Sequence, residues 1–170
     1  NTMIFITGCT GLVGSHLVAT LLYRQRSTDN GQQLIDESTF RVKLLCRKNS
    51  DLSLLKDVLK RYGINEIPSN IEFVYGDVLD YDILEEAMKD VDEVYHCAAV
   101  VSFDPSDKGS LMRVNVEGTK NMVNAALHCR VKKFCHVSSI AALGRSLEGE
   151  PINEESSWSP SKNNSVYSIS

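Results

Sequence analysis

The sequence contains no apolar run that approaches the roughly 20 residues a helix needs to cross a bilayer. No stretch with the pattern of a signal peptide precedes the first apolar segment, so we expect a cytoplasmic protein without a membrane partner. The net charge is only -4 and the basic residues are scattered, which argues against a nucleic-acid partner. Internal repeats and low-complexity tracts are also lacking, and the length suits one domain over residues 1–170.

The cysteine content does not indicate a disulfide framework, because the five cysteines are an odd number. Cys46, Cys97 and Cys135 lie inside apolar, strand-like segments, a pattern typical of buried, reduced thiols in a cytosolic protein. Three neighbouring pairs raise the alternative of a metal site: His96-Cys97, His128-Cys129 and Cys135-His136. Adjacent residues on a strand point to opposite faces, so neither strand pair could chelate one ion, and we predict no metal.

Apolar β-rich segments alternate with helical patterns along the whole chain. The predicted strands are 2–7, 41–46, 71–75, 93–98 and 133–138, and the predicted helices are 12–24, 51–61, 80–89 and 107–129. Asp51 and Asp80 are suitable helix N-caps, and Gly63 stands where a C-cap belongs. Repeated βα units predict an α/β fold with a doubly wound parallel sheet, in the strand order 3-2-1-4-5.

Two segments lack periodicity. Residues 25–40 are polar and irregular, and we expect them to form an inserted surface loop. Residues 144–165 are rich in serine and carry several glycines and prolines. A loop of this length inside a compact domain is usually functional.

A glycine-rich segment, Thr7-Gly8-Cys9-Thr10-Gly11-Leu12-Val13-Gly14, directly follows the first apolar run. A strand that breaks into a glycine turn and reopens as a helix is suited to holding a pyrophosphate, because the helix N-terminus presents amide groups to it. Gly8 permits the tight turn, Gly11 permits close approach of the backbone, and Gly14 permits close packing of helix on strand. The alternative is a glycine turn without a ligand.

Six segments together resemble the extended short-chain dehydrogenase/reductase family, within the NAD-dependent epimerase/dehydratase superfamily. The similarity is greatest to its dihydroflavonol-reductase-like and 3β-hydroxysteroid-dehydrogenase-like members. The segments are Thr7 to Gly14, Gly76-Asp77-Val78, Tyr95 to Ala99, Asn115-Val116-Glu117-Gly118-Thr119, His136 to Ser139, and Tyr167 as the tyrosine of a Y-x-x-x-K motif. The resemblance implies a nicotinamide-cofactor-binding Rossmann fold, with the glycine segment from Gly8 to Gly14, including Cys9, Thr10, Leu12 and Val13, at the cofactor.

The resemblance also implies further cofactor contacts. Asp77 would accept a hydrogen bond from the adenine amino group and the Val78 amide would donate to the ring, although Gly76-Asp77 could simply turn the chain. Ala98, Ala99 and Val100 would let the backbone pass close to the nicotinamide half. Where an acidic residue would bind the ribose of NAD, the sequence has Arg47 and Lys48, which favour the 2′-phosphate of NADP. NAD is the alternative, because a basic pair after a strand is often only solvated surface.

Ser139 and Tyr167 are the predicted catalytic residues. By the resemblance, Ser139 holds the substrate oxygen at the carboxyl end of the fifth strand, and Tyr167 transfers the proton beside the nicotinamide. Two serines at a strand end could instead cap a turn. Asn115 could support the active site, or it could cap or pack its helix. The motif lysine would stand directly after Ser170, so we expect this chain to be the cofactor-binding portion of a longer enzyme and inactive alone.

The sequence therefore predicts an NADP-dependent oxidoreductase acting on a small-molecule ketone or secondary alcohol. A nucleotide-sugar epimerase or dehydratase with tightly held NAD shares every motif named above and is the main alternative. A non-catalytic sensor or scaffold that binds NAD(P) is the third. The resemblance further implies a homodimer through helix 107–129 and the helix that begins near Tyr167.

Overall fold

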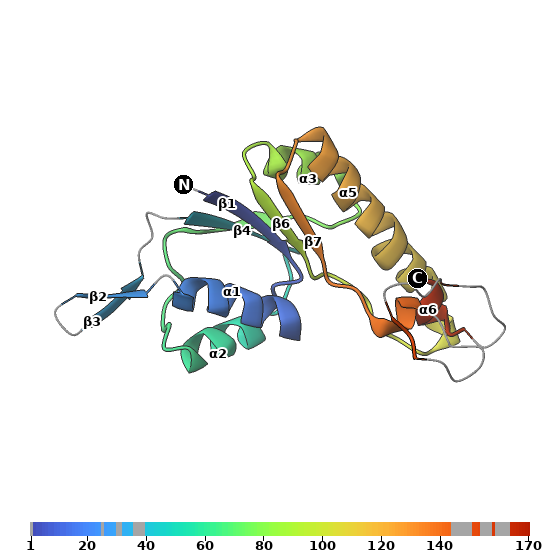
Figure 1. Cartoon of the computed structure of the whole chain (residues 1–170), viewed down its shortest axis with the longest axis horizontal. Helices are drawn as coiled ribbons and strands as arrows, with labels where there is room; N and C mark the ends of the chain where they lie inside the picture. The colour runs from blue at the N-terminus through green and yellow to red at the C-terminus, as the bar shows by residue number, and fades with distance from the viewer. Residues whose placement is uncertain are drawn as a thin grey trace.

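The computed structural model describes residues 2–24, 26–29, 32–35, 40–143, 151–153, 158 and 164–170. Its main sheet has five strands in the order β5-β4-β1-β6-β7, and all four neighbouring pairs are parallel (Figure 1). The strands are β1 (Thr2–Thr7), β4 (Phe40–Cys46), β5 (Ile71–Tyr75), β6 (Glu93–His96) and β7 (Lys133–His136). In chain order this is the predicted arrangement 3-2-1-4-5, and the expected α/β fold is confirmed.

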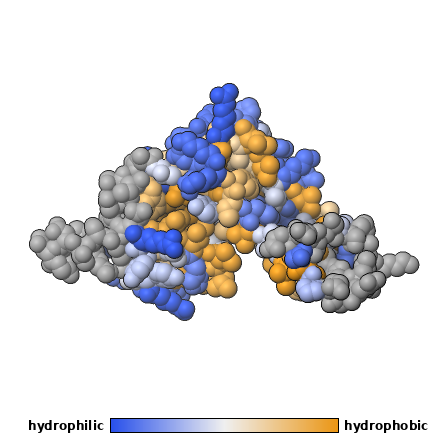
Figure 2. Space-filling view, in the orientation of Figure 1, coloured by the Kyte–Doolittle hydropathy of each residue, from blue (hydrophilic) through white to orange (hydrophobic). Residues whose placement is uncertain are grey.

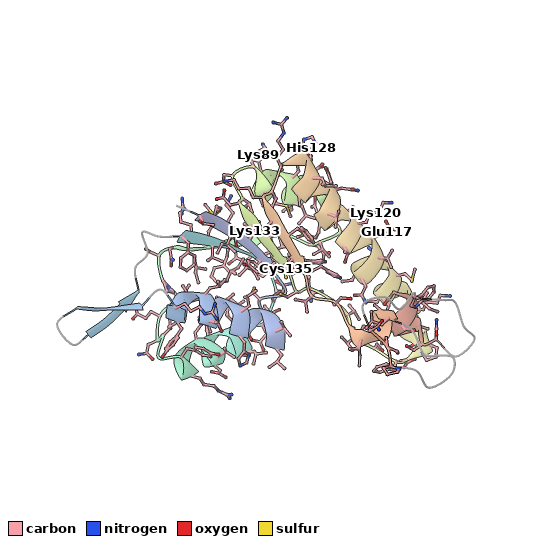
Figure 3. All side chains as sticks on the ribbon, viewed as in Figure 1. Lys89, Glu117, Lys120, His128, Lys133 and Cys135 are labelled. Carbon is pink, nitrogen blue, oxygen red and sulfur yellow. The ribbon has the colours of Figure 1, made fainter. Side chains whose placement is uncertain are left out.

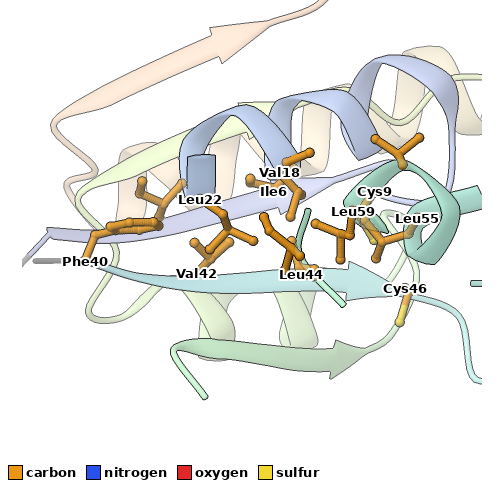
Figure 4. Packing of buried hydrophobic residues seen from close by; sticks show 14 residues of the cluster. Ile6, Cys9, Val18, Leu22, Phe40, Val42, Leu44, Cys46, Leu55 and Leu59 are labelled. Carbon is orange, nitrogen blue, oxygen red and sulfur yellow. The ribbon is translucent and has the colours of Figure 1, made fainter. Parts of the chain in front are cut away.

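Helices cover both faces of this sheet. Helices α1 (Leu12–Arg24) and α2 (Ser53–Arg61) lie on one face, and α3 (Tyr81–Met88) and α5 (Thr119–His128) lie on the other (Figure 1). Side chains of β1 alternate between the two faces, as successive residues of a strand must. Ile4 and Ile6 pack into the cluster beneath α1 and α2 (Figure 4), whereas Met3 and Phe5 pack beneath α3 and α5.

The predicted helix ends are partly right. The Asp80 carboxylate accepts a hydrogen bond from the Ile83 amide at 3.3 Å and caps α3. Gly63 follows α2 with a φ of 73°, in the left-handed region where glycine is favoured. Asp51 is not the N-cap of α2, because Leu52 takes that position. The Asp51 carboxylate instead accepts from the Ser53 amide in the turn before the helix, and this bond lowers the pKa of Asp51.

One of the two segments without periodicity differs from its expectation. The inserted segment 25–40 is not wholly irregular, because β2 (Arg26–Asp29) and β3 (Gln32–Ile35) form an antiparallel pair within it. The sequence between them reads Asn-Gly, a dipeptide that strongly favours tight hairpins and that the composition argument overlooked. The segment 144–165 lies mostly outside the described residues.

The predicted single helix 107–129 consists of several parts. A 3₁₀ turn, η1 (Pro105–Asp107), leads into α4 (Lys108–Leu111), a π-helical segment, η2 (Met112–Gly118), and then α5. Such wide turns are frequent at functional sites, and Asn115 lies in the middle of this one. Two short elements follow β7: η3 (Ile140–Leu143) and α6 (Val166–Ile169).

Strands β6 and β7 end two residues earlier than predicted. The Cys97 amide still donates to the Thr7 carbonyl, but the next amide, of Ala98, donates to the Thr7 hydroxyl, so a side chain replaces strand pairing.

All five cysteines are free thiols. Cys135 is nevertheless exposed rather than buried, because β7 is an edge strand (Figure 3). None of the described helices is long and apolar enough to cross a membrane.

Candidate functional site

The glycine segment joins β1 to α1 in a tightly packed turn. Gly8 has a φ of 71°, and a Cβ placed on it would lie 2.6 Å from the Ala98 nitrogen. A Cβ on Gly14 would lie 2.1 Å from the Gly8 carbonyl oxygen. Gly11 differs, because its amide closes the turn onto the Gly8 carbonyl at 3.0 Å and a Cβ there would meet nothing nearer than 3.4 Å. Gly8 and Gly14 are therefore required by the chain's own packing, while Gly11 leaves open space.

That open space belongs to a cleft of about 220 Å³ at the carboxyl edge of the sheet, which we call the glycine-loop cleft. Segments that follow four neighbouring strands contribute to it, together with one residue of η2. The lining residues are Thr7, Gly8, Thr10, Gly11, Leu45, Cys46, Arg47, Ser50, Gly76, Asp77, Val78, Cys97, Ala98, Ala99, Val100 and Val114. Ligands of open α/β sheets bind at this edge.

Nine of the predicted cofactor residues line this cleft, and six do not: Cys9, Leu12, Val13, Gly14, Lys48 and Tyr167, the last of which lines a second pocket. The Cys9 thiol is fully buried and donates to the Leu45 carbonyl, with 3.8 Å between sulfur and oxygen. Burial raises the pKa of Cys9 to about 12, so this thiol stays protonated and ties the turn to β4. Leu12 and Val13 are exposed at the start of α1, and Lys48 is exposed beside the cleft.

Arg47 stands at the rim of the cleft in a short turn that holds its backbone. Its amide donates to the Ser50 hydroxyl at 3.1 Å, and the Ser50 amide donates back to the Arg47 carbonyl at 2.9 Å. Because the Ser50 oxygen accepts this bond, its O–H can donate to a ligand in the cleft. Sequence reasoning did not identify Ser50; the turn that brings it beside Arg47 is the only signal.

Asp77 has two roles in the structure. Its carboxylate accepts from the Leu79 amide at 3.0 Å and its carbonyl accepts from the Asp80 amide, so it does turn the chain. It also lines the cleft, which keeps the proposed adenine contact open. The neighbouring Val78 side chain is buried, and its carbonyl accepts from the Asn121 amide group at 3.2 Å.

A buried histidine fixes the wall between the strand ends. His96 Nδ1 lies 2.7 Å from the Thr7 hydroxyl, and His96 Nε2 lies 3.0 Å from the Thr119 hydroxyl. The Thr7 oxygen also accepts from the Ala98 amide, and in the tautomer with the proton on Nε2 its O–H donates to Nδ1. Burial, and secondly the neighbouring His136, lower the pKa of His96 to about 4. The ring is therefore neutral at pH 7 and links β1, β6 and α5.

A second pocket, of about 100 Å³, contains both predicted catalytic residues. We call it the Ser–Tyr pocket; its lining includes Ser139, Tyr167, Asn115, Thr119 and His136. Ala98 and Ala99 line both this pocket and the glycine-loop cleft, so the two spaces share one wall. The Ser139 oxygen accepts from the Ala141 amide at 3.2 Å. This serine does cap a turn, and its O–H remains available to a substrate oxygen.

Asn115 connects the two walls of the Ser–Tyr pocket. Its side-chain oxygen accepts from the Val100 amide at 2.8 Å, and its nitrogen donates to the Val100 carbonyl and to the Ser170 hydroxyl, both at 2.9 Å. The amide thus fixes the loop after β6 and the segment that carries Tyr167 at the same time. Of the alternatives left open for Asn115, support of the site describes its contacts best.

His136 is a second residue that sequence reasoning missed. It lies opposite His96 in the parallel register, and the two rings stack with centroids 5.3 Å apart. His136 also lines the Ser–Tyr pocket. In the sequence it stands in the pair Cys135-His136 and in one of the segments that carry the family resemblance. Among the described residues no three His, Cys, Asp or Glu side chains cluster to hold an ion.

A doubly wound parallel sheet with a glycine loop at its switch point defines the Rossmann-like class of α/β domains. Within that class, the model of the NAD-dependent epimerase/dehydratase family matches residues 4–170, and the chain belongs to this family. The resemblance found in the sequence is thereby confirmed.

Similar proteins within this family have different activities. Sterol demethylase protein B of Methylococcus capsulatus is 30% identical over 155 residues, which cover 91% of this chain and 39% of that protein. A putative dihydroflavonol 4-reductase of Synechocystis is 30% identical over 150 residues, covering 88% of this chain and 36% of that protein. The chain therefore spans less than half the length of these curated relatives.

The fold is also similar to that of solved enzymes. The dTDP-glucose 4,6-dehydratase DesIV from Streptomyces venezuelae, solved with NAD bound, superposes with a TM-score of 0.74. Its sequence is 25% identical, and the match covers 99% of this chain and 48% of that one. The family thus includes both reductases and sugar-nucleotide dehydratases, and the likeness alone does not choose between them.

Proposed function

We propose that the whole protein is an NADP-dependent oxidoreductase that moves hydride between the nicotinamide and a ketone or secondary alcohol. The observation that carries this proposal is the shared wall, since Ser139 and Tyr167 line a pocket that meets the glycine-loop cleft at Ala98 and Ala99. A substrate held by the two hydroxyls would therefore lie next to whatever occupies the cleft. The relatives that are reductases support the reaction class.

The residues of the glycine-loop cleft fit a nicotinamide dinucleotide. A Cβ would clash at Gly8 and Gly14 but not at Gly11, whose bare face lines the cleft, and the N-terminus of α1 follows directly. Asp77 and Val78 in the lining would contact the adenine, and Arg47 with Ser50 would hold a 2′-phosphate. DesIV, a dehydratase of this fold, holds NAD, so the preference for NADP rests on Arg47. When bound, the cofactor supplies or accepts the hydride.

The side chains of the Ser–Tyr pocket would handle the proton. Tyr167 would donate its phenolic proton to the carbonyl oxygen during reduction and take it back during oxidation. Ser139 would hold the same oxygen through its O–H. Asn115 would act as a positioning residue, because it fixes the Val100 backbone on one side and Ser170 on the other. A free tyrosine is a weak base near pH 7, so nearby positive charge is needed, and the family's motif lysine would provide it.

A nucleotide-sugar epimerase or dehydratase is the second candidate, and the likeness to dTDP-glucose dehydratases favours it. The same serine and tyrosine would serve such an enzyme. The two candidates differ in the net oxidation state of the cofactor after one turnover. An epimerase or dehydratase regenerates its cofactor in each cycle, whereas a reductase leaves it oxidised. Arg47 in the cleft argues for an exchanging NADP rather than a retained NAD.

We further propose that residues 1–170 form the cofactor-binding part of a longer cytoplasmic enzyme that works as a homodimer. The length of the relatives supports the first point, and the five free thiols agree with a reducing compartment. Val123 and Leu127 are exposed on α5, the helix that also carries the polar side chains Lys120 and His128 (Figure 3). Sedimentation of the full-length protein as a monomer at micromolar concentration would contradict the dimer.

Kinetics of Tyr167→Phe in the full-length enzyme test the proposed chemistry. The variant keeps the ring and removes the proton, so turnover should fall at least about 10²-fold, while cofactor affinity stays within about twofold. Ser139→Ala should also lower turnover without loss of cofactor. Turnover of Tyr167→Phe within a few-fold of the wild type would remove this residue from the mechanism.

A further inference from the structure

A chain of hydrogen bonds crosses the wall between the glycine-loop cleft and the Ser–Tyr pocket. It begins at the Ala98 amide, which donates to the Thr7 hydroxyl at 3.1 Å. The Thr7 hydroxyl lies 2.7 Å from His96 Nδ1, and His96 Nε2 lies 3.0 Å from the Thr119 hydroxyl. Thr7 lines the cleft and Thr119 lines the pocket, so the chain joins the two spaces through the interior. The strand ends that carry it lie beside the hollow between the α1–α2 end and the η3–α6 end of the molecule (Figure 2).

The burial of Thr7 and His96 favours one direction for these bonds. Both side chains are fully buried. The Thr7 oxygen accepts from the Ala98 amide, and among the described residues His96 Nδ1 is the acceptor available to the Thr7 O–H. A buried donor without an acceptor would cost free energy. This favours the tautomer in which Nδ1 is bare and Nε2 carries the proton and donates to Thr119.

In this tautomer every bond of the chain points toward the Ser–Tyr pocket. The Thr119 oxygen accepts from His96, and its own O–H has no other partner in the described part of the chain, so it can donate into the pocket. Hydrogen bonds that point the same way polarise one another, which strengthens the last donor. Burial, and secondly the neighbouring His136, lower the pKa of His96 to about 4. The ring therefore stays neutral and the chain keeps its direction near pH 7.

We propose that Thr119 is a third hydroxyl of the active site, held by His96 as a donor that stabilises negative charge in the Ser–Tyr pocket. The inference rests on the proposed function, in which Tyr167 gives up its phenolic proton and is left as a phenolate. Thr119 and Tyr167 line the same pocket of about 100 Å³. A fixed donor at the place where charge develops stabilises that charge without further reorganisation. His96 is the positioning residue of this donor.

Other ionisable groups near Tyr167 have to be separated from the effect of Thr119. The described lining of the pocket contains two titratable side chains, Tyr167 of α6 and His136 of β7, and His96 of β6 stacks on His136. Two variants at position 119 share all neighbouring charges, so a comparison between them reports the hydroxyl alone. The charged side chains of η1 and its N-cap, α4, η2 and the start of α5 lie outside the described lining: Asp104, Asp107, Lys108, Arg113, Glu117 and Lys120.

Ionisation of Tyr167 in the full-length protein tests the proposal without a substrate. The readout is the ultraviolet absorbance of tyrosinate against pH, from which the curve of the same protein carrying Tyr167→Phe is subtracted. Thr119→Val keeps the shape and removes the hydroxyl, so we expect the midpoint of this ionisation to rise by about one pH unit. Thr119→Ser keeps the hydroxyl and should stay close to the wild type.

Two measurements on His96 test its role as the positioning residue. His96→Asn should also raise the midpoint in the protein with Thr119, but should add little in Thr119→Val, because His96 acts through the threonine. Nitrogen NMR of the isotopically labelled imidazole, with the signal identified by its loss in His96→Asn, should find the proton on Nε2. A proton on Nδ1 would make Thr119 donate to the ring and would overturn the proposal.

The outcomes separate this inference from the proposed function. If the midpoint is the same in Thr119→Val, Thr119→Ser and the wild type, no hydroxyl at this position acts on Tyr167 and the inference is wrong, whether or not the enzyme reduces ketones. If both variants shift it equally, packing and not the hydroxyl is responsible, which also contradicts the inference. If the midpoint shifts as expected but Tyr167→Phe keeps its turnover, Thr119 does act on Tyr167 and the proposed function is wrong.

Discussion

At the scale of single residues, the site is built from side chains with two tasks each. Ser139, Asp77 and Ser50 each accept a backbone amide and also line a pocket. The turn each residue stabilises is what holds its oxygen at the carboxyl edge of the sheet. In the sequence, a role in a turn and a role in a binding site were alternatives for Asp77 and Ser139. In the fold, each of these residues stabilises a turn and also lines a pocket.

The cofactor preference should depend on Arg47 and not on its neighbour. Arg47→Ala removes a guanidinium that lines the cleft, so the affinity for NADP should fall roughly tenfold to hundredfold, with little effect on NAD. Lys48→Ala is the matched control, because Lys48 is exposed outside the cleft lining. Titration of the full-length enzyme with both cofactors measures the preference. If the ratio of NADP to NAD affinity is unchanged in Arg47→Ala, Arg47 does not bind the 2′-phosphate. If this ratio changes more in Lys48→Ala than in Arg47→Ala, Lys48 is the residue that binds it.

At the scale of the elements, different glycines of the β1–α1 turn are needed for folding and for cofactor binding. Gly14→Ala would push a Cβ to 2.1 Å from the Gly8 carbonyl oxygen, a backbone atom that no side-chain rotation can relieve. We expect the full-length protein to lose at least about 2 kcal/mol of unfolding free energy. Gly11→Ala, with 3.4 Å of room, should cost less than about 1 kcal/mol but weaken cofactor binding, because this glycine lines the cleft.

Denaturant unfolding and cofactor titration of the two glycine variants check this separation. Equal destabilisation by Gly11→Ala and Gly14→Ala would show that the turn adapts as a whole and that the packing argument is wrong. If Gly11→Ala leaves the cofactor affinity unchanged, the cofactor does not bind in the glycine-loop cleft.

Most of the elements could be predicted from the sequence, because the apolar periodicity of each strand and helix is set by the face it buries. The alternation of Met3, Ile4, Phe5 and Ile6 between two cores is such a case. Three features could not be predicted in this way. The β2–β3 pair lies in a polar segment without apolar periodicity, the π-helical η2 places Asn115 against Val100, and His136 comes to lie beside His96 through the register of β7 with β6.

At the scale of the whole molecule, His96 links the halves of the sheet and should make stability depend on pH. An unfolded histidine titrates near 6.5, whereas burial holds the pKa of His96 at about 4 in the fold. Between these values the unfolded chain binds a proton that the folded chain does not. Stability should therefore fall as the pH decreases from 6.5 to 4, by up to roughly 3 kcal/mol, and should not depend on this group above pH 6.5.

The contribution of His96 can be isolated with His96→Asn, which cannot titrate. Asp90, Asp92 and Glu93 also have lowered pKa values, chiefly through hydrogen bonds to lysines, and they weaken the fold in acid in both proteins. The difference between the two melting curves from pH 7 to pH 5 reports His96 alone. We expect the wild type to lose stability faster over this range, and parallel curves would contradict the role assigned to the ring.

The central claim is net hydride transfer, and the most direct test follows the hydride itself. The full-length enzyme is incubated with NADPH carrying deuterium at the transferred position and with a panel that includes 4-phenylbutan-2-one and sugar nucleotides. The account predicts deuterium on the carbinol carbon of an alcohol product, matched mole for mole by NADP⁺, and loss of both in Tyr167→Phe. Conversion of a sugar nucleotide by an enzyme whose cofactor stays bound and shows no net change would contradict it.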